Sequence, residues 1–219
     1  MKIVAFSDFH GSSTAVEKAA DATAETGAEL MLIAGDLAFH DFGSAFSILQ
    51  RLSNSKVPIF FVPGNMDIPE LTTAQNPGKF TCIHGRCERF GSFSFIGLGG
   101  MVQGPFQTSF ESSEEESYDT LHKAVKACEE AKIVLLSHTP PKNTSVDLTR
   151  SGRHVGSRAV RRFIEEVEPI LVVCGHIHEA RGIDRIGRTL VLNPGPIQNQ
   201  LYSLIELTDT IDVKLLEFS

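Results

Sequence analysis

The hydrophobic pattern contains five short runs of apolar residues, and each run is followed almost at once by side chains that bind metal ions. The runs are Lys2–Ser7, Leu30–Ala34, Ile59–Val62, Ile133–Ser137 and Ile170–Cys174. Parallel strands that are buried on both faces have this nearly unbroken apolar character. We therefore predict buried strands in an α/β fold, with the chemistry located beyond their carboxyl ends.

The residues that follow these runs carry carboxylate, amide or imidazole groups. They are Asp8, His10, Asp36, Asn65, His138, His176 and His178. Because the carboxyl ends of neighbouring parallel strands lie at one edge of a sheet, we expect all seven side chains to converge on a single rim. So many nitrogen and oxygen donors in one place predict a site for two metal ions.

The regions between the runs predict helices and, later in the chain, antiparallel strand pairs. Asp8 to Asp36 is 28 positions and Asp36 to Asn65 is 29, close to the ~30 residues of a βαβ unit. Helices are expected after Ser12 or Ser13, at Ala45–Leu52, from Ser112 or Ser113 to about Glu130, and from Ser157 to Pro169. Antiparallel pairs are expected around Gly91-Ser92, for Arg181–Ile186 with Thr189–Asn193, and for Tyr202–Leu207 with Ile211–Leu216. We expect residues 1–219 to form a single domain of two sheets packed face to face, with helices outside.

Composition limits the classes of partner. With 42% hydrophobic residues, the chain has enough apolar surface for a sizeable core. The net charge of -7 argues against broad binding to a nucleic acid polymer, but bound cations would still permit a small phosphorylated substrate. The longest apolar run is far shorter than the ~20 residues of a membrane span, and the ligand-bearing N-terminal strand is unlike a signal peptide. We therefore expect no membrane partner and a cytoplasmic location.

The four cysteines are expected to be reduced and mostly buried. Cys82, Cys87, Cys128 and Cys174 lack the spacing of a zinc site, and two of them lie in strand-like runs. Disulfides are also rare in cytosolic proteins.

The polar motifs occur in the order Asp8-x-His10, Gly35-Asp36, Gly64-Asn65-x-Asp67, His138 and Gly175-His176-x-His178. This order resembles the calcineurin-like metallophosphoesterase superfamily, and in particular its small prokaryotic phosphodiesterases. Each motif alone is weak, but all five in order, each behind an apolar run, form a strong signal. The resemblance implies an α/β fold that is a four-layer αββα sandwich of two mixed β-sheets flanked by helices.

The resemblance also implies how the ligands are shared between two divalent metal ions. The first ion would take Asp8, His10, Asp36 and His178, and the second Asp36, Asn65, His138 and His176. A hydroxide that bridges the ions would attack phosphorus in line with the leaving oxygen. Because the donors are oxygen and imidazole, Mn²⁺ is expected to serve in vitro, with Fe, Zn²⁺, Ni²⁺ and Co²⁺ as further candidates.

One position departs from the pattern of many members of this superfamily. They have a histidine directly after the motif asparagine, placed to protonate the leaving oxygen, whereas this chain has Met66. We consider His154 as a substitute acid or substrate contact, with an ordinary loop histidine as the alternative. Asp67 is expected to orient a ligand rather than to bind a metal ion.

Other residues near the motifs leave two interpretations open. Arg150 and Arg153 would either hold the outer oxygens of a phosphate or lie solvated on the surface. Met101 and Phe106 would form either an apolar wall for the organic part of a substrate or ordinary core packing.

The function predicted from these residues is metal-dependent hydrolysis of a small phosphate ester, most simply a phosphodiester. The runner-up is a phosphomonoesterase, including a protein phosphatase, with the same centre. A non-catalytic scaffold of the same fold, such as the retromer subunit, is less favoured because every ligand position holds a competent residue. A nuclease is disfavoured because this short acidic chain has no basic and aromatic stripe. The sequence leaves homo-oligomerisation open.

Overall fold

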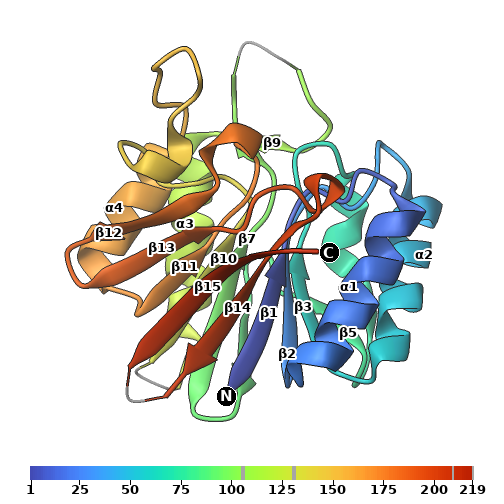
Figure 1. Cartoon of the computed structure of the whole chain (residues 1–219). Helices are drawn as coiled ribbons and strands as arrows, with labels where there is room; N and C mark the ends of the chain where they lie inside the picture. Colours follow the sequence, from blue (N-terminus) through green and yellow to red (C-terminus); the bar gives the residue numbers. More distant parts are fainter. Residues whose placement is uncertain (105–106, 130–131, 209, 219) are drawn as a thin grey trace.

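The computed structural model describes residues 1–104, 107–129, 132–208 and 210–218, and two large sheets form its centre (Figure 1). The first sheet has the order β15-β14-β1-β2-β3-β5-β4, in which the run from β1 to β5 is parallel. Its strands are β1 (Lys2–Phe6), β2 (Leu30–Ala34), β3 (Ile59–Val62), β4 (Gln75–Asn76), β5 (Phe80–Cys82), β14 (Leu201–Leu207) and β15 (Ile211–Glu217). β14, β15 and β4 add antiparallel neighbours, so the sheet is mixed.

The second sheet has the order β12-β13-β11-β10-β7-β6. Its strands are β6 (Cys87–Phe90), β7 (Phe93–Leu98), β10 (Ile133–Ser137), β11 (Leu171–Val173), β12 (Gly182–Ile186) and β13 (Thr189–Asn193). β13, β11, β10 and β7 are parallel, whereas β12 and β6 pair antiparallel at the two edges. A separate short pair, β8 (Met101–Val102) with β9 (Glu111–Ser112), lies in the loop before the next helix. The three predicted antiparallel pairs are confirmed.

Four α-helices cover the outer faces of the two sheets. α1 (Ser13–Thr26) and α2 (Phe42–Leu52) lie on the first sheet, and α3 (Glu114–Lys126) and α4 (Arg158–Val167) lie on the second (Figure 1). The predicted four-layer αββα sandwich is therefore confirmed. No helix among the described residues has the length and apolar character that crossing a membrane requires.

The helix starts follow local capping chemistry. Ser12 accepts a hydrogen bond from Ala15 N at the start of α1, and Ser113 with Glu116 forms the predicted capping box of α3. α2 begins at Phe42, before the predicted Ala45, because Asp41 caps it by accepting from Ser44 N. α3 ends at Lys126, before the predicted end near Glu130, which itself lies outside the described residues.

Alternation along the strands sorts the core into three layers. In β1, Ile3 and Ala5 point between the two sheets, whereas Val4 and Phe6 point toward the helices of the first sheet. The other helical layer packs on the second sheet through side chains such as Phe163. Each fully buried large side chain contributes roughly 1.5–3 kcal/mol, so these layers fix the strands in place.

Two of the four cysteines correct the sequence-based expectation. Cys87 of β6 and Cys128, just after α3, form a disulfide across 41 residues of chain. The prediction of reduced thiols is wrong for this pair, because the sequence does not show that an edge strand lies beside the end of α3. It holds for Cys82 and Cys174, which are free and buried.

Replacing Cys128 with Ser is expected to lower the free energy of unfolding by up to about 4 kcal/mol, because a closed loop of 41 residues restricts the unfolded chain. Thermal unfolding under oxidising conditions measures this change. A reductant should lower the midpoint of the wild-type protein but leave that of the variant unaltered. Equal midpoints of both proteins without reductant would contradict the disulfide.

Candidate metal centre

The structure brings the seven predicted donor residues to one rim, where the carboxyl ends of both sheets meet. Asp8, Asp36 and Asn65 follow β1, β2 and β3 of the first sheet, whereas His138 and His176 follow β10 and β11 of the second. His10 and His178 come from the same two loops as Asp8 and His176 and complete the set.

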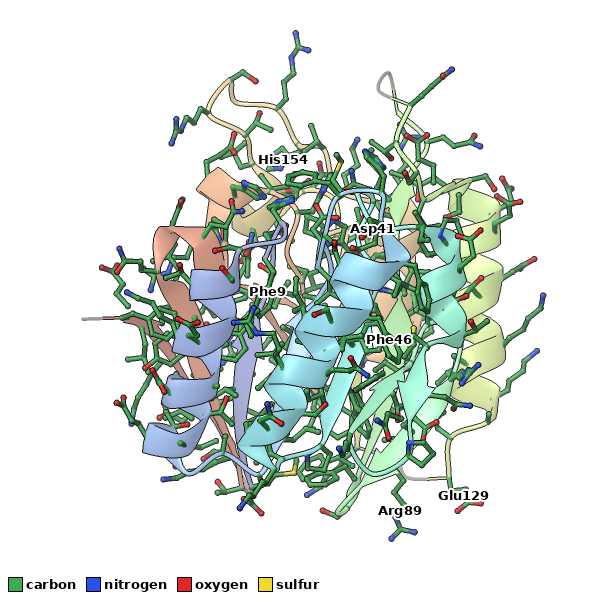
Figure 2. All side chains as sticks on the ribbon, turned by 90° about the vertical axis from the view of Figure 1, so that its right-hand side faces the viewer. Phe9, Asp41, Phe46, Arg89, Glu129 and His154 are labelled. Atoms are coloured by element: carbon green, nitrogen blue, oxygen red, sulfur yellow. A yellow bond between two sulfur atoms is a disulfide. The ribbon has the colours of Figure 1, made fainter. Side chains whose placement is uncertain are left out.

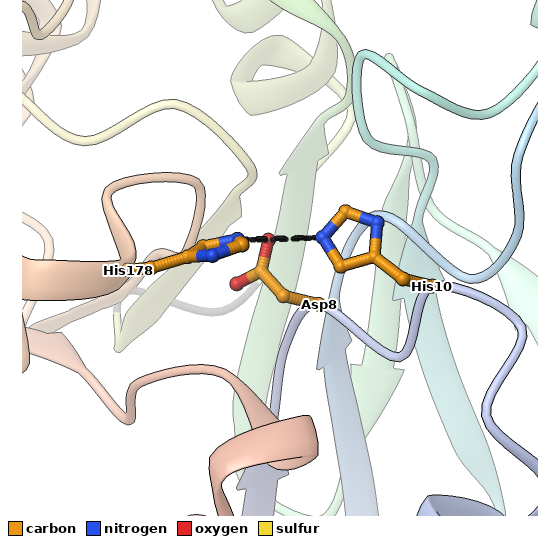
Figure 3. A group of neighbouring side chains, drawn as sticks. All are labelled: Asp8, His10 and His178. Atoms are coloured by element: carbon orange, nitrogen blue, oxygen red, sulfur yellow. Dashed lines mark hydrogen bonds and ion pairs between the residues drawn. The ribbon is translucent and has the colours of Figure 1, made fainter.

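Asp8, His10 and His178 form the first group of candidate ligands. Their ligand atoms lie within 4.8 Å of one another. The Nε2 atoms of the two histidines are 3.3 Å apart, and Nε2 of His178 is also 3.3 Å from Oδ1 of Asp8. Figure 3 shows the three side chains pointing toward one another, Asp8 and His10 from one loop and His178 from another.

Asp8, Asp36 and His138 form the second group, and Asn65 joins it. Nδ1 of His138 is 2.7 Å from the carbonyl oxygen of Ala34, which fixes this nitrogen as the donor in the neutral ring. Nε2 therefore presents a lone pair to Oδ1 of Asn65 at 2.9 Å and to Oδ1 of Asp36 at 3.6 Å. Acceptors that face one another in this way need a cation between them.

The buried carboxylate of Asp8 gives the clearest indication of a bound cation. Its side chain is 1% exposed, neither oxygen forms a well-aligned hydrogen bond with a described residue, and its ion-pair contact is with Nε2 of His178, 3.3 Å from Oδ1. Buried polar groups are nearly always fully satisfied, and a carboxylate costs most when it is not. The donor set thus fits metal ions on the observation of a buried carboxylate with unfilled acceptor positions, independently of the motif pattern.

The electrostatics of the site favour an ionised Asp8 beside neutral rings at His10 and His176. Burial opposes ionisation of Asp8, but the imidazoles of His178 and His138 outweigh it and lower the pKa of Asp8 to about 2. Burial lowers the pKa of His10, and it lowers that of His176 to about 3. His178 differs, because its hydrogen bond with Asp8 raises its pKa, and a metal ion bound there would displace the proton from that ring.

Backbone strain is concentrated at these residues. Asp8, His10, Asp36 and His176 all have positive φ angles, of 59°, 47°, 53° and 68°. Non-glycine residues rarely adopt this conformation, and such strain clusters at functional sites. The backbone conformation at these four residues therefore sets the direction of four of the seven donor side chains.

Two motif glycines are required by close packing. Gly35 has a φ of 91°, and a Cβ at this position would collide with the imidazole of His138. A Cβ at Gly64 would collide with the carboxylate of Asp36. The Gly-Asp and Gly-Asn motifs thus reflect how closely the β2 and β3 loops approach each other and His138.

Asp67 joins the loops that carry the donors. Its buried carboxylate accepts hydrogen bonds from the backbone N–H groups of Leu37, Ala38 and Gly64 at 2.8–3.0 Å. Burial and the neighbouring charge of Asp36 raise the pKa of Asp67 to about 6. The residue is placed to orient its neighbours and does not face the donor atoms of the two groups.

Phe39 contributes to the site without any sequence signal. Its ring stacks on that of His10 with centroids 4.9 Å apart, although it is 52% exposed. Nδ1 of His10 has no hydrogen-bond partner among the described residues, so this stacking holds the ring where a hydrogen bond usually would. A phenylalanine in a turn gives no indication of such a role.

His154 is not brought to the seven donors. Its Nδ1 lies 2.7 Å from Oδ1 of Asp147, which is fully buried and also accepts from backbone N–H groups of the same loop. Figure 2 shows His154 near the end of the molecule that also carries Asp41, far from Arg89 and Glu129.

A cleft of about 870 Å³ opens beside the second group of donors. Asn65, Met66 and His176 line it, and so do Met101 and Arg153. Arg150 and His154 are absent from its lining, and Phe106 lies outside the described residues.

Comparison with known proteins agrees with this geometry. The family model of the calcineurin-like phosphoesterase superfamily domain matches residues 1–209. The chain belongs to this superfamily. An uncharacterized protein of Methanocaldococcus jannaschii is 36% identical over 203 residues, which span 90% of this chain and 88% of that protein.

Two solved structures show how widely this phosphoesterase fold is shared. A crystal structure of a protein from Thermus thermophilus is 21% identical with a TM-score of 0.77, covering 97% of each chain. A dimetal phosphatase from Danio rerio is 11% identical with a TM-score of 0.66, covering 98% of this chain and 95% of that one. At these identities the likeness shows the fold alone. Members of the superfamily are typically dinuclear metal-dependent hydrolases, and the described part of this chain has two candidate ligand groups.

Replacing Asp67 with Asn is expected to destabilise the phosphoesterase by about 1.5–3 kcal/mol, because an amide cannot accept all three backbone hydrogen bonds. The loops that carry Asp36 and Asn65 should loosen, which is expected to weaken Mn²⁺ binding roughly 10- to 100-fold. Thermal unfolding and titration calorimetry measure the two effects. Asp119→Asn, on the exposed side of α3, is the matched control, and indistinguishable behaviour of the two variants would refute the role of Asp67.

Proposed function

We propose that this chain is a phosphodiesterase that hydrolyses a small phosphate ester at a centre of two divalent metal ions. The supporting observation is the convergence of the buried carboxylates of Asp8 and Asp36 with histidine nitrogens, in two groups whose ligand atoms lie within 4.8 Å of one another. When bound, the ions would supply a nucleophilic hydroxide for in-line attack and neutralise charge on the phosphate.

The chain's own residues would divide between the ions as follows. Asp8, His10, Asp36 and His178 would hold the first, and Asp36, Asn65, His138 and His176 the second. Asp36 is suited to bridging, because Oδ2 lies 3.7 Å from Nε2 of His10 while Oδ1 lies 3.6 Å from Nε2 of His138. The backbone N–H of Met66 donates to Oδ1 at 2.8 Å and fixes this orientation.

Two features favour a diester over a monoester. Met66 lines the cleft directly beside Asn65 and has no proton to give, so a leaving group that needs little protonation is preferred. A diester also carries a second organic arm, and the cleft beside Asn65 offers room and apolar surface for it.

A phosphomonoesterase with the same centre, including a protein phosphatase, is the second candidate. A non-catalytic scaffold is less favoured, because such a protein has no need to bury two carboxylates, Asp8 and Asp36, beside converging histidines. Mn²⁺ is the ion we expect to support activity in vitro, and Fe, Zn²⁺, Ni²⁺ and Co²⁺ suit the same oxygen and nitrogen donors.

Replacing Asp36 with Asn is expected to abolish hydrolysis of bis-(p-nitrophenyl) phosphate in Mn²⁺ while leaving the protein folded, because the bridging charge is lost and the side-chain volume is kept. Release of p-nitrophenolate measures activity, and thermal unfolding checks the fold. Asp212→Asn, exposed on β15, is the control and should keep wild-type turnover.

Two outcomes would count against this proposal. Wild-type turnover by the Asp36→Asn protein would refute the bridging role. A wild-type protein that hydrolyses neither diesters nor monoesters in any of Mn²⁺, Ni²⁺, Co²⁺ or Zn²⁺ would support the scaffold instead.

His154→Ala tests the proposed acid. Because Nδ1 is engaged by the buried Asp147, we expect the substitution to loosen the loop and to lower turnover equally for good and poor leaving groups. An acid role requires a larger loss for a phenyl ester than for a p-nitrophenyl ester. Comparison of kcat/KM for the two esters, in wild type and variant, separates these roles.

A further inference from the structure

The cleft beside Asn65 and His176 is much larger than a phosphate group requires. Its volume of about 870 Å³ lies in the upper part of the ~300–1,000 Å³ range of small-molecule sites. Its lining includes Asn65 and His176, which belong to the proposed ligands of the second metal ion. It would therefore receive the organic group attached to a phosphate that is bound there.

Apolar side chains make up much of the lining of this cleft. Met66, Met101, Val102, Val155 and Ile177 line it, and Val155 is 40% exposed. Methionine side chains adapt to irregular shapes, so this surface suits an organic group and does not select one geometry.

Cationic side chains also line the cleft, in a chain whose net charge is -7. Lys142, Arg153 and Arg158 line the cleft, and none of their charged groups forms an ion pair with a residue that the structure describes. Three unpaired cations at one cleft form a site for a negatively charged group.

One carboxylate, Glu114, also lines the cleft, but it is already engaged. Its Oε1 accepts from the backbone N–H of Arg158 at 2.9 Å, and its Oε2 accepts from Ser157 Oγ at 2.6 Å and Ala159 N at 2.7 Å. Glu114 of α3 therefore caps the first turn of α4 and leaves the cationic side chains available.

We propose that the substrate is a phosphate ester whose organic part has an apolar portion and also carries a second anionic group. The apolar part would lie against Met66 and Met101, and the second anion would pair with Lys142, Arg153 and Arg158. This inference rests on the proposed hydrolase function and specifies its substrate class.

A matched pair of esters tests it. Thymidine 5′-(p-nitrophenyl phosphate) and its 3′-phosphorylated form share the leaving group and differ only in the second anion. In Mn²⁺ we expect kcat/KM for p-nitrophenolate release to be at least tenfold higher for the 3′-phosphorylated ester. The preference should shrink as ionic strength rises, because the cations are near the surface.

Substitutions test whether Arg153 and Lys142 cause the preference for the 3′-phosphorylated ester. Arg153→Gln and Lys142→Gln should each lower the ratio of the two kcat/KM values at least threefold. Arg188→Gln removes the same charge from the turn before β13, at the end of that strand remote from the site, and should leave the ratio unchanged.

The outcomes separate the two proposals. Hydrolysis of both esters with a ratio near one, or a ratio that Arg153→Gln and Lys142→Gln leave unaltered, would overturn the second-anion inference while the hydrolase stands. Failure to hydrolyse either of these esters or any other phosphate ester would overturn the proposed function itself. Activity that keeps rising with oligothymidylate length would favour a polymer and also overturn the inference.

Discussion

The site depends on the packing of the two sheets, in which the carboxyl ends of the parallel strands meet at one rim. Contacts among the donor residues themselves contribute little free energy to holding them together. Asp8 and Asp36 are both buried carboxylates, and burial together with the charge of Asp8 raises the pKa of Asp36, against the opposing effect of His138. Acceptors of this kind repel when no cation lies between them. The apolar layer between the sheets must therefore hold them in place.

Several local interactions position the individual donor groups once the sheets are packed together. Asp67 joins the β2 and β3 loops through three backbone hydrogen bonds, and the Ala34 carbonyl fixes the ring of His138. The strained φ angles of Asp8 and Asp36 persist because the strands before them are fully buried. Packing of the core thus stabilises a site whose metal-free form is unfavourable.

The sequence predicted much of this arrangement because its main determinants are local. Buried strands have a continuous apolar pattern, and the donors follow them directly, so Asp8 and His138 could be placed at a common rim. What it missed depends on contacts distant in sequence. The stacking of Phe39 on His10 and the disulfide between Cys87 and Cys128 have no spacing rule, since each arises only when separate loops or edges meet. The pairing of Asp147 with His154 is local, but it depends on how an irregular loop folds back on itself, which no periodic pattern predicts.

The two sides of the centre differ in a way that bears on how a diester would lie. His178 is 42% exposed beside Asp8, and Phe39 is exposed next to His10, so the first donor group opens toward solvent. The second group contains the fully buried His138, and the cleft borders it at Asn65. An ester bound across both groups would have one arm near water and the other against apolar and cationic surface. Because Met66 offers no proton, the arm near water is the better leaving group, since solvent can protonate it there.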